Sequence, residues 1–66
     1  MDITMIIEEL AFDSEVALAC SRSTAYRTKN AVNYILERDK YDWRVKLVID
    51  RTAHLPYSLV VVPEEG

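Results

Sequence analysis

The chain has 66 residues, half of them hydrophobic, and its formal net charge is −3. Its length allows one small domain, and its hydrophobic content excludes a disordered chain. We therefore predict a single α+β domain over residues 1–66. The lone Cys20 excludes an internal disulfide and is typical of a reducing, cytoplasmic compartment. One Cys and one His cannot build a four-ligand structural zinc site, and we expect no metal or cofactor.

Residues 3–12 form the first apolar segment, and their pattern fits two kinds of element. Ile3, Met5 and Ile7 alternate as in a strand, while other apolar residues of the same segment recur with helical spacing. We predict a strand here, because the segment is rich in β-branched residues and a helix-start signal follows it. The segment resembles neither a signal peptide nor a membrane span.

Residues 14–40 are predicted to form one long helix. Asp13 or Ser14 can cap its first turn, and Glu15 is favourable near the positive end of the helix dipole. Small and apolar residues recur on about one third of the helical wheel, which is the stripe that an amphipathic helix packs against a sheet. The only glycine of the chain is Gly66.

The C-terminal third predicts a hairpin. Trp43 to Asp50 alternates apolar and polar residues, Pro56 interrupts the following loop, and Tyr57 to Val62 forms a second strand that is apolar on both faces. We predict a βαββ domain whose three-stranded sheet carries one long helix on one face. The last strand is expected between the other two and antiparallel to both, because a central position accounts for its apolar residues on both faces.

A second architecture has a short sequence motif in its favour. The stretch Ser21-Arg22-Ser23-Thr24-Ala25-Tyr26-Arg27 resembles the start of the recognition helix in helix-turn-helix DNA-binding proteins. This resemblance implies a winged helix-turn-helix with element order αααββ, in which Ser23 caps the recognition helix and Ser23–Asn30 enters the major groove. The chain lacks the glycine of the usual turn, and Ala17 lies closer to the first serine than those families place their alanine.

The sequence offers little material for catalysis, and we predict that the protein is not an enzyme. Cys20 and His54 are the one combination of a nucleophile and a base that resembles a catalytic pair. No interior glycine is available to expose the thiol or to build a phosphate-binding loop. Cys20 is expected to be a small, partly buried apolar residue and His54 an ordinary loop residue.

Basic residues are concentrated in one part of the chain. Seven of the eight lie between Arg22 and Lys46, and no acid occurs from Val16 to Leu36. Long basic side chains often line the border of an amphipathic helix for packing alone. The alternative to this packing role is that the basic residues bind a partner. We predict an anion-binding surface with exposed tyrosines, composed of Arg22, Tyr26, Arg27, Lys29, Asn30, Asn33, Tyr34, Arg44 and Lys46.

These features predict a small binding protein that acts stoichiometrically, as an inhibitor, adaptor or sequestering protein. Its partner would be an acidic protein, a nucleotide or a nucleic acid, although the pI of 4.9 disfavours nucleic acid. A single helix covers only one face of the sheet, which leaves Val48 and alternate residues of the last strand uncovered. We therefore also predict a homodimer that buries this open face.

Overall fold

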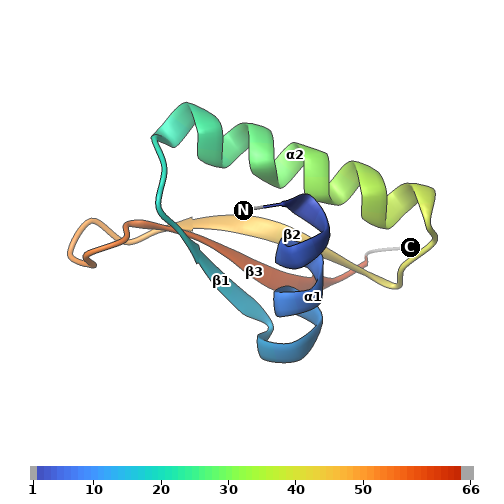
Figure 1. Cartoon of the computed structure of the whole chain (residues 1–66). Helices are drawn as coiled ribbons and strands as arrows, with labels where there is room; N and C mark the ends of the chain where they lie inside the picture. Colours follow the sequence, from blue (N-terminus) through green and yellow to red (C-terminus); the bar gives the residue numbers. More distant parts are fainter. Residues whose placement is uncertain (1, 65–66) are drawn as a thin grey trace.

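The computed structural model describes residues 2–64. Two helices lie on one side of a three-stranded sheet, with the longer helix running across the top of the molecule in Figure 1. In chain order the elements are α1 (Ile3–Asp13), β1 (Glu15–Leu18), α2 (Arg22–Arg38), β2 (Trp43–Ile49) and β3 (Tyr57–Pro63). The predicted α+β class, with a long helix packed on one face of a three-stranded sheet, is confirmed.

The sheet has the strand order β1-β3-β2, and β3 is antiparallel to both neighbours. This arrangement confirms the prediction that the last strand is central. In the register, Leu59 lies opposite Val16 on one side and opposite Leu47 on the other. Because β1 and β2 both oppose β3, they run in the same direction, and their C-terminal ends lie at the same end of the sheet.

The core forms a single layer between the sheet and the two helices. α2 packs over β2 and β3, while α1 packs over β1 and against α2. The buried residues form one cluster, contributed by both helices and all three strands: Ile6, Ile7, Leu10, Val16, Leu18, Ala25, Val32, Leu36, Val45 and Leu59. Within residues 2–64 there is no helix whose length and apolar content would let it cross a membrane.

The predicted strand over residues 3–12 is wrong, because this segment is α1. The side chains of Ile6, Ile7 and Leu10 share one face of the helix and are buried, whereas Met5 is 55% exposed. A strand would have placed Met5 on the same face as Ile7. The Asp2 side chain caps the helix by accepting a bond from the Thr4 N–H at 3.4 Å.

The predicted helix start at Ser14 is also wrong. Ser14 ends α1 in the left-handed conformation, with φ of 65°, and its N–H donates to the Leu10 carbonyl oxygen at 2.8 Å. The first strand follows at once as β1, Glu15–Leu18. The helix expected over residues 14–40 is therefore only α2, Arg22–Arg38.

The winged-helix alternative is wrong in its architecture. A helix-turn-helix needs a helix directly before Ser21, and the structure has strand β1 there. The cap of α2 is Ser21 rather than Ser23. The C-terminal hairpin is part of the core sheet and supplies the buried Val45 and Leu59, whereas a wing would lie beside the helices.

Candidate basic-aromatic surface on helix α2

The beginning of α2 determines which of its basic residues lie together. The Ser21 hydroxyl oxygen accepts a hydrogen bond from the Thr24 N–H at 3.4 Å and pairs with the Thr24 hydroxyl at 3.1 Å. The first of these bonds satisfies a backbone donor of the first turn that has no partner within the helix. From that start, Arg22, Tyr26 and Lys29 follow with spacings of four and three residues, so they share one side of the helix.

Arg22, Tyr26 and Lys29 form a compact group that we call the Tyr26 cluster. The Arg22 guanidinium carbon lies 5.9 Å from the centre of the Tyr26 ring, and the Lys29 ammonium nitrogen lies 5.6 Å from it. Both distances fall within the range of cation–π attraction, which holds the two cations near each other despite their like charge. The cluster therefore presents two positive charges and a partly exposed ring on one border of α2.

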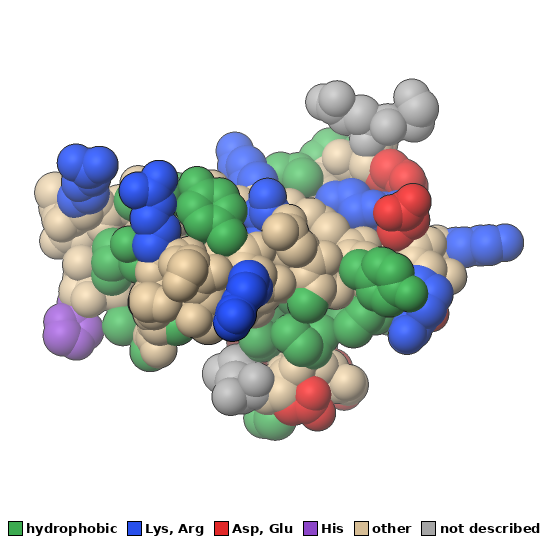
Figure 2. All heavy atoms as spheres, turned by 90° about the horizontal axis from the view of Figure 1, so that it is seen from above, with side chains coloured by type: hydrophobic (Ala, Val, Ile, Leu, Met, Phe, Trp, Pro, Cys, Tyr) green, Lys and Arg blue, Asp and Glu red, His purple; other side chains and the backbone are tan. Residues whose placement is uncertain are grey.

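In the described part of the chain, no acid forms an ion pair with the Tyr26 cluster. Among residues 2–64, the ion pairs are Arg38–Asp39 at 3.1 Å and Arg44–Glu64 at 2.9 Å, and both lie outside the cluster. Viewed from the α2 side, Lys and Arg side chains extend along the whole face, while acidic side chains occur only toward its right-hand and lower parts (Figure 2). The left part, where α2 begins, shows basic residues without acids.

A hollow next to the cluster contains a basic residue that the sequence reasoning missed. Arg22 and Arg51 line it together with Ile49, Pro56 and Tyr57, and its volume is about 250 Å³. The hollow forms because β2 runs in the same direction as β1 and so ends where α2 begins (Figure 1). Two guanidinium groups beside an apolar floor are suited to a ligand that has both negative charge and an apolar part.

Three other predicted site residues lie on the outer face of the same helix. Arg27, Asn30 and Tyr34 are exposed, and Tyr34 has 67% of its surface in solvent. Exposed tyrosines next to arginines are common in protein–protein interfaces. These residues therefore extend the basic-aromatic surface from the Tyr26 cluster along α2.

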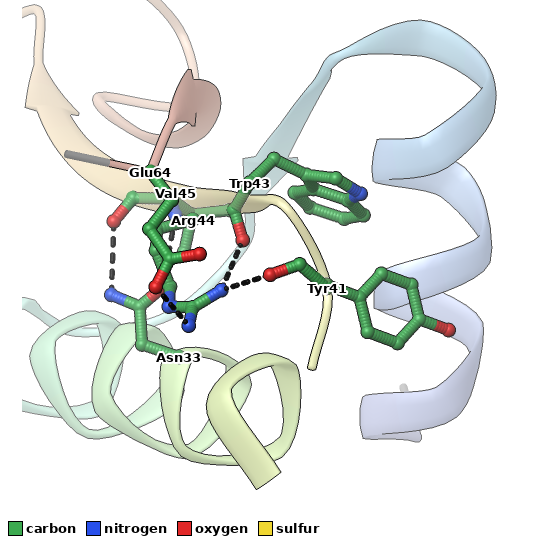
Figure 3. A network of polar contacts seen from close by, with 6 residues as sticks. All are labelled: Asn33, Tyr41, Trp43, Arg44, Val45 and Glu64. Carbon is green, nitrogen blue, oxygen red and sulfur yellow. Dashed lines mark hydrogen bonds and ion pairs between the residues drawn. The ribbon is translucent and has the colours of Figure 1, made fainter. Parts of the chain in front are cut away.

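Asn33 is directed toward the sheet rather than toward solvent. Its side-chain nitrogen donates to the Val45 carbonyl oxygen at 3.0 Å, and its side-chain oxygen accepts from the Val45 N–H at 2.9 Å (Figure 3). The amide thus uses one donor and one acceptor to bind a single residue of the edge strand β2. Asn33 ties α2 to the sheet, so its side-chain amide is engaged there and is not directed into the predicted anion-binding surface.

Arg44 and Lys46 are also separate from the Tyr26 cluster. The Arg44 guanidinium donates to the Tyr41 and Trp43 carbonyl oxygens, both at 2.8 Å, and pairs with Glu64 (Figure 3). Lys46 lies opposite Val60 in the β2–β3 register, on the sheet face away from the helices. The structure therefore brings Arg22, Tyr26, Lys29, Arg27, Asn30 and Tyr34 onto one helix surface and leaves Asn33, Arg44 and Lys46 elsewhere.

A groove of opposite charge lies on α1. Met5, Glu8, Glu9, Phe12 and Asp13 line a shallow hollow of about 350 Å³, and Phe12 is 88% exposed. A hydrogen bond to Asp13 and the charge of that carboxylate raise the pKa of Glu9. The molecule thus has an acidic surface on α1 and a basic one on α2.

The Cys20–His54 pair has no shared site in the structure. Cys20 is half-buried and lines a small hollow with residues of α1, β1 and α2, to which His54 does not contribute. His54 is exposed in the loop between β2 and β3. In the part of the chain that the structure describes, no group of three His, Cys, Asp or Glu residues is placed to hold a metal ion.

Neither a protein-family model, nor a curated protein, nor a solved structure matches this chain.

Proposed function

We propose that this protein is a small, non-enzymatic binding protein that acts stoichiometrically, as an inhibitor, adaptor or sequestering protein. Its partner is an acidic protein, which it engages through the N-terminal half of α2. The observation that carries this proposal is the Tyr26 cluster, in which two cations that form no ion pair within residues 2–64 flank an exposed ring beside Arg51. We place this activity in the cytoplasm, where the single free Cys20 stays reduced.

The charge balance favours an acidic protein over nucleic acid. The chain has a net charge of −3, and the acidic groove on α1 would be repelled by a long polyphosphate. A protein partner with a local acidic patch can meet the basic part of α2 without approaching α1. Tyr and Arg are also the residue types that most often dominate the energy of protein–protein interfaces.

The protein acts as a homodimer in this proposal. The sheet face away from the helices carries Val48, Val60 and Val62, and these three residues do not pack against the core cluster. Exposed apolar surface of this kind is typical of an interaction site. A second copy of the chain would cover it without obstructing α2, which lies on the other side of the sheet.

The proposal can be tested with a labelled oligoglutamate peptide as the acidic probe. We expect the double variant R22Q/K29Q to lower the affinity for this peptide by roughly tenfold, because it removes both cations of the Tyr26 cluster. Fluorescence anisotropy titrations at low salt give the dissociation constants, and circular dichroism checks the fold.

The variant R38Q/K40Q is the matched control, since it removes the same charge from the other end of α2. An equal loss of affinity in both variants would show that only net charge matters and would contradict the proposed site. Duplex DNA is titrated in parallel at low salt, where phosphate contacts are strongest. Tighter binding of DNA than of the peptide would replace the acidic protein with nucleic acid as the partner.

A further inference from the structure

The sheet face away from the helices has an ordered pattern of charge. Glu15 and Lys46 both lie opposite Val60, on its two sides, so the three residues form one row across the strands. Residues directly opposite in an antiparallel sheet share a face, and this row therefore has an acid at the β1 edge, an apolar centre and a base at the β2 edge. The row on one side of it, Ala17–Ser58–Val48, contains no charge, and in the row on the other side Arg44 lies opposite Val62 and pairs with Glu64.

The centre of this face is apolar and only partly shielded. Val60 and Val62 are half-buried, and Val48 is 36% exposed. Among residues 2–64, neither helix packs on this side, because the core cluster takes the opposite set of strand residues. Glu15 and Lys46 stand at the two margins, and the ion pairs of the described residues include neither of them.

We propose that a second copy of the chain binds this face about a two-fold axis parallel to the strands. Rotation about such an axis keeps the height along the strands and exchanges the two edges of the sheet. Val60 of one copy then meets Val60 of the other, and Glu15 of each copy faces Lys46 of the other. Opposite charges of the two copies therefore face each other at both edges of the interface. The apolar centre is buried between two sheets about 10 Å apart.

The charges favour this axis over a two-fold axis that lies in the same plane between the sheets but runs across the strands. A two-fold axis across the strands through the Val60 row would place Glu15 on Glu15 and Lys46 on Lys46. Like charges in contact disfavour an interface, whereas complementary charges fix its register. The inference rests on the proposed homodimer and adds to it the symmetry axis and the paired residues.

The size of the face predicts a weak dimer. Strands of 4, 7 and 7 residues, spaced about 4.8 Å apart with about 3.4 Å per residue, give roughly 290 Å² of flat sheet per copy. A standard stable interface buries about 800 Å² per partner. The dimer is therefore expected to dissociate on dilution, and the two Glu15–Lys46 contacts should have a large influence on its equilibrium.

A charge swap tests the inference. Sedimentation velocity across a concentration series is compared for the wild type, E15K, K46E and the double variant E15K/K46E. Each single variant brings two like charges together and is expected to weaken the dimer by about tenfold or more. The double variant restores opposite charges at both margins and should return the dissociation constant close to that of the wild type. K40E controls for net charge, because Lys40 lies outside the sheet.

Each outcome bears on a different part of the proposal. A monomeric wild type at every concentration would overturn both the homodimer and the paired margins. A dimeric wild type whose affinity is unchanged in E15K and K46E would overturn the pairing and leave the homodimer standing. A double variant as weak as the single variants would also overturn the pairing. Circular dichroism of all five proteins shows that a loss of dimer is not a loss of fold.

Discussion

At the scale of single residues, the most informative contact is that between Asn33 and the edge strand. Val45 lies opposite Val61 in the sheet, and its N–H and C=O groups point away from β3 toward Asn33. Such unpaired edge groups can recruit a further strand from another chain. The Asn33 amide occupies both groups of Val45, so it covers part of the β2 edge and also fixes α2 over the sheet.

We predict that Asn33→Ala destabilises the protein by about 1–2 kcal/mol, because it removes two hydrogen bonds in a partly buried position. Urea unfolding followed by Trp43 fluorescence gives the free energy of unfolding. Asn30→Ala is the matched control, because it makes the same change in helix propensity at an exposed position of the same helix. Equal stability of the two variants would show that the Asn33 contact contributes nothing.

Ser14 shows how one residue can hide an element boundary. Its left-handed conformation, with φ of 65°, is the one that usually calls for glycine or asparagine at a helix end. Lys40 adopts a similar φ of 60° shortly after α2. Because neither position has a glycine, the sequence shows no stop signal at the end of α1. The Asp13-Ser14-Glu15 stretch fits the start of a helix, whereas it forms the end of one helix and the beginning of a strand.

At the scale of elements, the C-terminal part of the fold could be predicted and the N-terminal part could not. The β2–β3 hairpin has clear alternation and a proline in its loop, and the apolar run of β3 indicated its central position. β1 has only four residues, which is too short for a distinct period-two pattern. Its pairing is with β3, which is distant from it in the sequence.

The candidate surface was predictable to a similar degree. Helical spacing was sufficient to bring Arg22, Tyr26 and Lys29 together, since that relation is local. Arg51 was missed because its place depends on the topology: β1 and β2 are parallel, and this brings the β2–β3 loop to the start of α2. The role of Asn33 could not be inferred, because its partner Val45 is 12 residues away and its orientation depends on how α2 packs on the sheet.

The C-terminal half of α1 gives a prediction for pH. Asp13 raises the pKa of Glu9 through a hydrogen bond and through its charge, so folded protein holds the Glu9 proton more tightly than unfolded protein. The contribution of Glu9 to the free energy of unfolding therefore increases as the pH falls through the pKa of Glu9 in the folded protein. At neutral pH, where Glu9 is ionised, its charge is unfavourable. Two acids near the negative end of the α1 dipole add to this effect.

We predict that Glu9→Gln raises the thermal midpoint at pH 7 and that this gain disappears at about pH 3, where the wild-type side chain is protonated. Thermal unfolding followed by circular dichroism at both pH values measures the difference. Glu8→Gln removes the same charge next to this contact and is the control. A gain in Glu9→Gln that persists unchanged at low pH would contradict an electrostatic origin.

At the scale of the whole molecule, the sheet separates two surfaces. α2 and the Tyr26 cluster lie on one side of it, and the Glu15–Val60–Lys46 row lies on the other. A dimer formed through that row would carry its two α2 helices on opposite outer sides. Each copy would then bind its acidic partner independently, and the dimer would connect two partners instead of presenting one enlarged basic platform.

This separation predicts that partner binding and dimerisation can be lost independently. R22Q/K29Q should bind the oligoglutamate peptide weakly and remain a dimer, because the cluster lies on the helix side of the sheet. E15K and K46E should be monomers whose affinity for the peptide stays within about twofold of the wild type. These two variants change the net charge in opposite directions, so an effect on peptide affinity that they share must come from loss of the dimer. Peptide anisotropy and sedimentation velocity, measured on the same samples, separate the two properties. A similar loss of peptide affinity in both monomeric variants would mean that the binding surface spans two copies and would contradict independent sites.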